Sequence, residues 1–438
     1  MLLIIRCLLL IIMVVFSFYP ARAAKNEGKI RLEVFPDRAD CLYQLGDTAV
    51  FSVNIANPGR TSRPFLLRYA FSEDKARRLE QGELQTTGGS IKLAHGMERP
   101  GFLRLDLLLI AGADTLRQAS ACGFDPQAVR PTNILPPDFQ RFWRQGQAEL
   151  LRIPIDATLR RVTENEVAGA KRYLVSLACI EGSRMFGWLT VPEGRGPFPA
   201  VVHIMGAPGG IHEYRTDPGS GYARAGMIIL ALNIHGIELG LDQEVYEQYQ
   251  ARNLLGGFPF SGCDDPYRYY YRRVVLGGIR AMDYLCSRED ADTTRLAVAG
   301  DSQGGGLSLL VAALDKRVKA LTVNVPAMCD HTGVLYSRPT GWPHLLEREN
   351  GERVRRTSAY FDGALAAGFI EVPTLMTVSL LDESCPPTTV YAAYNNLKGP
   401  RWIYRYPGVD HPGSFTQERS QCLIKWLKDT LDSQEKQK

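Results

Sequence analysis

The sequence has little excess of charge of either sign. Its 438 residues carry 51 lysines and arginines against 47 aspartates and glutamates, a formal net charge of +4. No basic cluster interleaved with aromatic residues is present, so the sequence does not indicate a nucleic-acid partner. A small or neutral molecule is the partner class that this balance favours.

Motifs for metals and phosphates are also lacking. None of the seven histidines has HExxH spacing, and no group of cysteines and histidines has metal-ligand spacing. The glycine-rich stretch 206–210 lacks the Lys-Ser/Thr pair that completes a phosphate loop. We therefore expect neither a bound metal nor a cofactor.

Long apolar runs are confined to the N-terminus. Arg6 precedes an apolar run from Cys7 to Tyr19, and Ala21-Arg22-Ala23 follows it. This pattern is typical of a signal peptide, and the run is shorter than the about 20 residues of a membrane-spanning helix. We expect residues 1–23 to be removed and the protein to be exported, either to the periplasm or out of the cell, with no membrane partner. A membrane anchor is the alternative.

Cysteine is present in moderate number. Of nine cysteines, Cys7 leaves with the signal peptide, and the other eight permit disulfides in an oxidising compartment without requiring them. Cys41 and Cys122 are the best candidate pair.

Two composition patterns divide the remaining chain. Residues 25–123 hold short alternating stretches, as in 102–110, where leucines alternate with Arg104 and Asp106. Such strands, without helices between them, predict a small Ig-like β-sandwich. Residues 124–143 are proline-rich and lead into a helix for which Asp138 is the expected cap.

From 144 to 432, apolar strands alternate with helices. This pattern predicts an α/β fold, a mostly parallel sheet covered on both faces by helices. The stretch 329–369 interrupts the pattern and is interpreted as an insertion over the pocket.

One G-x-S-x-G motif, GDSQG at 300–304, lies where an apolar strand ends and a helix begins. This is the context of a nucleophile elbow, in which Gly300 and Gly304 allow the backbones to approach closely. The turn leaves the serine strained and projecting from the edge of the sheet. The motif therefore predicts Ser302 as a nucleophile.

A serine needs a base, and the base needs an orienting acid. Asp382 follows the apolar stretch 373–381, and His411 lies in a loop before the last helix, in the chain order Ser, Asp, His of α/β-hydrolases. Asp382 as a turn residue and His411 as an ordinary loop histidine are the alternatives, with Asp410 a rival acid. We predict a Ser302–His411–Asp382 triad.

An oxyanion needs two hydrogen-bond donors near the nucleophile. The helix that follows Ser302 offers the N–H of Gln303, and the glycine-rich loop after the apolar strand at 200–205 offers the N–H of Ala207. For Ala207, an ordinary tight turn is the alternative.

At these residues the chain resembles the acetyl xylan esterase and cephalosporin-C deacetylase family of carbohydrate esterases. The similarity spans about Arg130 to the C-terminus, and three segments carry it: GDSQGG at 300–305, DDPYRYYYRRVVLGGIRAMDYL at 264–285, and LLDESCPPTTVYAAYNNLKGP at 380–400, with His411 after them. The resemblance implies an α/β-hydrolase that removes acetyl groups from sugars, and a homo-oligomer, since a ring-like hexamer is known in the family.

Two positions depart from the family pattern. His235-Gly236-Ile237 stands where the family commonly has Arg-Gly-Gln, and Pro412 stands where Glu commonly follows the catalytic histidine. Neither position belongs to the triad. Both departures leave undecided which sugar carries the acetyl group and how many subunits assemble.

The predicted substrate contacts lie around the nucleophile. Met205 and Trp342 are expected beside the pocket, and Trp342 and Tyr360 could stack on a sugar or form the core of the insertion. Taken together, the sequence predicts an exported serine esterase that deacetylates carbohydrate through an acyl-enzyme. A serine peptidase of the same fold and a non-catalytic carbohydrate-binding protein are the alternatives.

Overall fold

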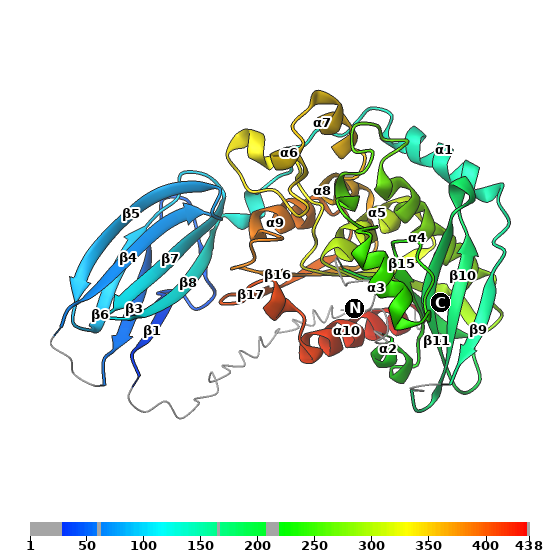
Figure 1. Ribbon diagram of the computed structural model, residues 1–438, viewed down its shortest axis with the longest axis horizontal. Helices are drawn as coiled ribbons and strands as arrows, with labels where there is room; N and C mark the ends of the chain where they lie inside the picture. Colours follow the sequence, from blue (N-terminus) through cyan, green and yellow to red (C-terminus); the bar gives the residue numbers. More distant parts are fainter. Residues whose placement is uncertain (1–28, 59–62, 164–166, 207–218, 436–438) are drawn as a thin grey trace, which may run out of the picture.

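A computed structural model describes residues 29–58, 63–163, 167–206 and 219–435 (Figure 1). The predicted signal peptide, residues 1–23, and the oxyanion donor Ala207 lie outside these ranges. Within them, no helix is both long and apolar enough to cross a membrane.

The N-terminal part is a sandwich of two sheets, drawn in blue and cyan in Figure 1. The three-stranded sheet has the order β1-β3-β6 and the five-stranded sheet the order β2-β8-β7-β4-β5. The strands are β1 (Arg31–Pro36), β2 (Leu42–Tyr43), β3 (Ala49–Ala56), β4 (Phe65–Glu73), β5 (Arg77–Thr86), β6 (Gly89–His95), β7 (Gly101–Ala111) and β8 (Asp114–Phe124).

Alternating side chains build the core of this sandwich. Phe51, Leu67 and Leu105 are fully buried, as their period-two spacing predicts. Cys41 directly precedes β2 and Cys122 lies near the end of the neighbouring β8, but both are free thiols. The candidate pair therefore does not form a disulfide: the Cys41 thiol turns back toward the carbonyl of Ala39, 3.9 Å away.

The second part is built on one nine-stranded sheet of order β17-β16-β15-β14-β12-β13-β11-β10-β9. Strands β17 to β13 of this order pair in parallel, and β11, β10 and β9 add antiparallel strands at one side. The strands are β9 (Thr158–Val162), β10 (Ala170–Ala178), β11 (Arg184–Pro192), β12 (Phe198–Ile204), β13 (Ile228–Asn233), β14 (Ala291–Asp301), β15 (Val318–Asn324), β16 (Thr374–Ser379) and β17 (Arg401–Tyr406).

Helices cover both faces of this sheet. The α-helices are α1 (Phe139–Leu151), α2 (Ser220–Arg224), α3 (Gln243–Ala251), α4 (Tyr270–Cys286), α5 (Gln303–Leu314), α6 (Leu345–Arg348), α7 (Glu352–Ser358), α8 (Gly363–Ala366), α9 (Pro387–Asn396) and α10 (Gln417–Glu435). Short 3₁₀ helices are η1 (Pro126–Ala128), η2 (Ile180–Gly182), η4 (Phe258–Phe260), η5 (Gly333–Tyr336), η6 (Ala367–Phe369) and η7 (Pro412–Ser414). Buried side chains of α2 and α10 form the core on one face, and those of α4 and α5 contribute to the core on the other. The predicted fold class, a mostly parallel covered sheet preceded by a β-sandwich, is confirmed.

The linker between the two parts is bonded along its length to the second part. Asp330 Oδ1 accepts hydrogen bonds from the Thr132 N–H and hydroxyl at 2.6 and 2.7 Å. Asn133 Nδ2 donates to Asp362 at 3.0 Å, and Asn395 Nδ2 of α9 donates to two linker carbonyls. Asp330 and Asp362 belong to the segment between β15 and β16, so the linker lies against the predicted insertion.

One expectation about this region is wrong, and one choice between two alternatives is decided. Asp138 stands at the N-cap position of α1, but its side chain caps nothing, because it accepts hydrogen bonds from Tyr360 Oη at 2.5 Å and Arg141 at 3.2 Å. Tyr360 is buried against Phe142, with ring centroids 4.8 Å apart. Tyr360 therefore belongs to the core of the insertion and not to a sugar-stacking surface.

Candidate active site

Ser302 lies in a sharp turn between β14 and α5. Its backbone has φ 52° and ψ −119°, a strained conformation for a residue with a side chain. A Cβ on Gly300 would lie 2.3 Å from the Gly304 carbonyl oxygen, and one on Gly304 would lie 1.9 Å from the Ile204 carbonyl oxygen. Only glycine fits at these two positions, which is why the motif can bring α5 this close to the sheet.

Backbone hydrogen bonds fix the turn from both sides. The Ser302 N–H donates to the Asn324 carbonyl at 2.9 Å, and the Ser302 carbonyl accepts from the Ala327 N–H at 2.9 Å. The neighbouring Asp301 accepts from His203 Nε2 and from Asn324 Nδ2, each at 2.9 Å. Burial opposes the charge on Asp301, but these bonds outweigh it and hold the pKa of that carboxyl below its usual value.

His411 and Asp382 complete a chain of hydrogen bonds to the serine. Ser302 Oγ lies 3.0 Å from His411 Nε2, and His411 Nδ1 lies 2.7 Å from Asp382 Oδ2. Asp382 is buried after β16, and His411 lies between β17 and α10. The order nucleophile, imidazole, buried carboxylate is the arrangement that activates a serine hydroxyl.

The rival acid is turned away from the imidazole. Asp410 is exposed, and its Oδ1 accepts from the Gly413 N–H at 2.9 Å, at the start of η7. Asp382 Oδ1, by contrast, accepts from the Ser384 and Cys385 N–H groups at 2.9 and 2.8 Å, which leaves Oδ2 for His411. Of the two carboxylates, Asp382 is therefore the one aligned with the imidazole.

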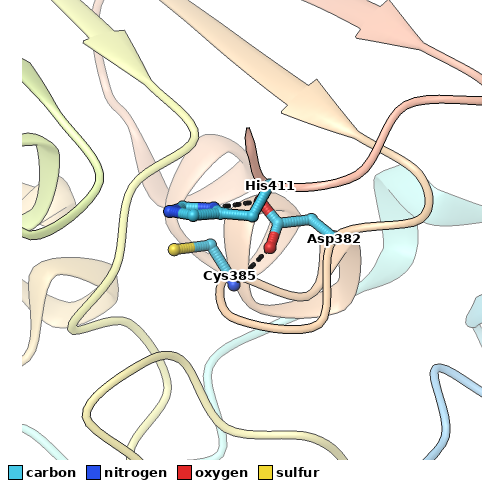
Figure 2. A group of neighbouring side chains, drawn as sticks. All are labelled: Asp382, Cys385 and His411. Atoms are coloured by element: carbon cyan, nitrogen blue, oxygen red, sulfur yellow. Dashed lines mark hydrogen bonds and ion pairs between the residues drawn. The ribbon is translucent and has the colours of Figure 1, made fainter. Parts of the chain in front are cut away.

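A buried thiol lies beside this pair. Figure 2 shows Cys385 beneath the ring of His411, with its backbone N–H on Asp382. Burial raises the pKa of this thiol well above its usual value, so it stays protonated. Asp382, Cys385 and His411 offer ligand atoms within 4.8 Å of one another, as a metal site would. Both oxygens of Asp382 and both ring nitrogens of His411 are, however, already engaged in the hydrogen-bond chain.

Gln303 follows the nucleophile and is fully buried. Its backbone N–H opens α5, where the first N–H groups of a helix have no partner within the helix. Its side-chain Oε1 accepts from Tyr271 Oη of α4 at 2.8 Å, which holds the residue in place. A Cβ added to Gly206, the last described residue before Ala207, would lie 3.2 Å from the Asp301 carbonyl oxygen. The glycine-rich loop therefore starts next to the turn that carries Ser302.

The predicted substrate residues differ in their surroundings. Met205 is partly buried and packs against the core on the α10 face. Trp342 is partly buried, and its ring centroid is 6.2 Å from that of Phe258. Its backbone N–H donates to the Ser384 carbonyl at 2.8 Å. Trp342 is thus bonded to the loop that carries Asp382.

His235, at the first departure from the family pattern, is a buried neutral residue. Its Nδ1 lies 2.8 Å from Tyr270 Oη, and its ring packs edge-on against Phe258 at 4.8 Å. Burial, helped by Arg273, lowers the pKa of His235 to about 4, so the ring is uncharged at neutral pH.

Sequence reasoning missed several residues around the triad. Arg104, Lys75 and Asp74 of the sandwich contact the segment Leu381–Thr388. Their side chains come from β7 and from the turn between β4 and β5, more than 270 residues away, and no local pattern marks them. Tyr271 lies in a segment already noted for its resemblance, and only its contact with Gln303 was not foreseen.

Comparison with known proteins identifies the family. The family model "Acetyl xylan esterase (AXE1)" matches residues 126–430. This chain belongs to the acetyl xylan esterase family. A curated member, acetyl esterase Axe7A from Xylanibacter ruminicola, is 31% identical over 399 residues, which cover 90% of this chain and 89% of that protein. The enzyme is therefore a carboxylic ester hydrolase, and the predicted resemblance is confirmed.

Two solved structures of acetyl xylan esterases are similar to this chain. An acetyl xylan esterase from Paenibacillus sp. R4 is 31% identical, with a TM-score of 0.59, covering 69% of this chain and 98% of that one. Acetyl xylan esterase 1 from Thermoanaerobacterium sp. JW/SL YS485 is 24% identical and has the same TM-score, covering 70% and 97%. The predicted α/β-hydrolase fold is confirmed.

Proposed function

We propose that the protein is an exported serine esterase that removes acetyl groups from carbohydrates through an acyl-enzyme. The observation that carries this proposal is the hydrogen-bond chain from Ser302 through His411 to the buried Asp382, with links of 3.0 and 2.7 Å. Membership of the acetyl xylan esterase family supports acetylated saccharide as the substrate.

In the acylation step, Ser302 Oγ attacks the acetyl carbonyl carbon while His411 Nε2 takes the hydroxyl proton. Asp382 holds the Nδ1–H and stabilises the imidazolium that forms. The carbonyl oxygen becomes an oxyanion, for which the Gln303 N–H is one donor and the Ala207 N–H, outside the described residues, is the proposed second. The bond from the acetyl carbon to the sugar oxygen then breaks, and His411 protonates that oxygen.

Deacylation repeats these steps with water. His411 takes a proton from a water molecule, whose oxygen attacks the acetyl-Ser302 ester, and the same donors hold the oxyanion. The bond to Ser302 Oγ breaks, the proton returns to the serine, and acetate leaves. All bonds are made and broken by groups of this chain and one water, so the step needs no cofactor.

Acetate release tests the proposed activity. Acetylated xylan, acetylated oligosaccharides and peptides would be offered to the wild-type enzyme and to Ser302→Ala. We expect acetate from the saccharides, none above background from the variant, and no cleavage of peptides. Peptide cleavage would replace the proposal with a peptidase, and no turnover of any ester would replace it with a binding protein.

The acyl group is a second part of this test. We infer a small acyl pocket, because the buried segment 326–329 adjoins Ser302, whose carbonyl accepts from the Ala327 N–H. Each extra methylene that does not fit costs about 1–3 kcal/mol of transition-state binding. We expect kcat/KM to fall at least about tenfold from acetyl to butyryl esters of one alcohol. Rates that rise with acyl length would indicate a general carboxylesterase. Export is tested by the N-terminus of the mature protein, expected at Ala24.

A further inference from the structure

Arg104 of β7 is buried although its strand predicts an exposed side chain. Its side chain is 8% exposed and reaches across to the α/β domain. Nη1 donates to the Leu381 carbonyl at 3.1 Å, and Nη2 donates to Glu383 Oε1 at 2.9 Å. One guanidinium thus bonds the residues immediately before and after Asp382.

The guanidinium is itself held in orientation. Nε donates to both carboxylate oxygens of Asp106, two residues along β7, at 3.0 and 3.1 Å. A planar donor with two fixed edges orders a partner better than a flexible ammonium does. Residues 380–386, between β16 and α9, form the acid loop that carries Asp382. Arg104 can therefore transmit the position of the sandwich to the acid loop.

Two further groups of the sandwich hold Glu383 of this loop and Thr388 in the first turn of α9. Lys75 Nζ donates to Glu383 at 2.6 Å, and Asp74 Oδ2 accepts from the Thr388 N–H at 3.1 Å. Burial opposes the charge on Glu383, but Lys75 and Arg104 outweigh it and lower the pKa of that carboxyl. Next to these polar contacts, the rings of Phe102 and Tyr391 pack at 5.2 Å.

Two backbone hydrogen bonds within the α/β domain hold the side of the acid loop that faces away from the sandwich. The Leu381 N–H donates to the Val409 carbonyl at 3.0 Å, and the Trp342 backbone N–H donates to the Ser384 carbonyl at 2.8 Å. The outer side, at Glu383 and Thr388, is bonded to the sandwich. The match to the Paenibacillus structure covers 98% of that chain and 69% of this one. This share leaves little room for the sandwich, and the family model begins at residue 126, so the family fold forms without the sandwich.

We propose that the β-sandwich domain positions the catalytic acid, and that Arg104 is the positioning residue through which it keeps Asp382 in line with His411. The inference rests on the proposed function of Asp382. In this view the sandwich is part of the catalytic apparatus, acting on kcat through the acid loop without touching the substrate.

Steady-state kinetics on an aryl acetate test the role of Arg104. We expect Arg104→Ala to lower kcat between about tenfold and a hundredfold with KM unchanged, since small misplacements of catalytic groups cost this much. Arg104→Lys, which keeps one charged donor, should recover part of the loss. Glu383→Gln, at a side chain that is 54% exposed and tolerant of change, should show a smaller loss of the same kind.

Arg99→Ala is the matched control. Arg99 also crosses from the sandwich to the α/β domain, but it bonds the carbonyls of Tyr336 and Ser337 instead of the acid loop. We expect kcat within about twofold of wild type for this variant. Thermal unfolding of each variant separates loss of fold from loss of rate. Equal losses of kcat in Arg99→Ala and Arg104→Ala at equal stability would overturn the proposal.

A double-mutant cycle with Asp382→Asn separates this inference from the proposed function. If Arg104 acts through Asp382, adding Arg104→Ala to Asp382→Asn should change kcat by less than about twofold. The same fold-loss in both backgrounds would overturn the positioning role while leaving the triad intact. Asp382→Asn with wild-type turnover would instead overturn the proposed function.

Discussion

The loops that carry Ser302 and Asp382 are held in place by different means. The Ser302 turn is fixed inside one domain by backbone hydrogen bonds to Asn324 and Ala327 and by glycine packing against Ile204. The Asp382 loop is fixed on its outer side by charged side chains of another domain, with Arg104 at its centre.

The position of Ser302 is therefore a property of the α/β fold itself, whereas the position of Asp382 also depends on the interface between the domains. Close backbone packing is insensitive to salt and pH. Ion pairs that are half exposed, such as Lys75–Glu383, are screened by salt and contribute little each. We therefore expect the nucleophile to stay in position under conditions in which the acid does not.

The largest effect is expected at the nucleophile itself. Ser302→Ala removes the attacking oxygen, and we expect kcat on an aryl acetate to fall by about 10⁶, as for deletion of a triad serine. Covalent labelling by a serine-directed phosphonate should disappear with it. Labelling that persists at another serine would place the nucleophile elsewhere.

A smaller loss is expected at the acid. Asp382→Asn keeps the shape of the loop but favours the wrong tautomer of His411, and we expect a loss of about 10⁴ in kcat. Asp410→Asn, at an exposed residue that does not contact the imidazole, should stay within about threefold of wild type. The opposite ranking would make Asp410 the acid.

A substitution in the elbow should act on folding rather than on chemistry. Gly304→Ala places a Cβ 1.9 Å from a backbone oxygen of β12, and we expect a loss of about 3 kcal/mol in the free energy of unfolding. Gly351→Ala is the control, because its added Cβ meets only Val354 at 3.9 Å. Denaturant unfolding of both variants measures the difference. Equal stability of the two would mean that the turn is not close-packed.

Salt should act on the acid loop alone. Because Glu383 is 54% exposed, raising NaCl from about 0.05 to 1 M screens its pairs, and we expect kcat to fall by about two- to threefold. Glu383→Gln, which has no charge to screen, should show a flat salt profile. An equal salt effect in that variant would exclude the ion pairs as its cause.

The smallest effect is expected from Asp74, which accepts hydrogen bonds from Thr388 at the interface. Burial raises the pKa of Asp74 to about 7, so the fold disfavours its charged form. A raised carboxyl pKa stabilises the fold fully below the unfolded value near 4 and loses that contribution as pH rises through about 7. Asp74→Asn should flatten the decline of Tm between pH 5 and 8, by about 1–2 °C, as read by thermal unfolding. An unchanged decline would mean that Asp74 does not titrate in this range.

The sequence predicted the central sheet well because its strands are buried on both faces. The second half of β14 (LAVAG, 296–300) and most of β16 are apolar runs, and the groups that follow these two strands are Ser302 and Asp382. Four strands, β2, β5, β8 and β9, had no predicted counterpart. Of these, β5 and β9 are edge strands with mostly polar, exposed side chains, so neither has the apolar period that marks a strand.

The contact between domains could not be predicted for another reason. The alternation in β7 distinguishes the two faces of the strand, but it does not say whether the polar face meets water or another domain. Arg104 and Leu381 are 277 residues apart, and only the docking of the finished domains brings them together. The candidate pair Cys41 and Cys122 shows the same limit of the sequence. The two thiols are free, and the spacing of cysteines along the chain carries no information on the direction of their side chains.

The bonded linker has a consequence for how the molecule moves in solution. Thr132 and Asn133 are tied to Asp330 and Asp362, and Asn395 holds the linker carbonyls from α9. A chain fastened at these points does not act as a swivel. The two domains should therefore tumble with one rotational correlation time, and the sandwich should keep its contact with the acid loop while they do.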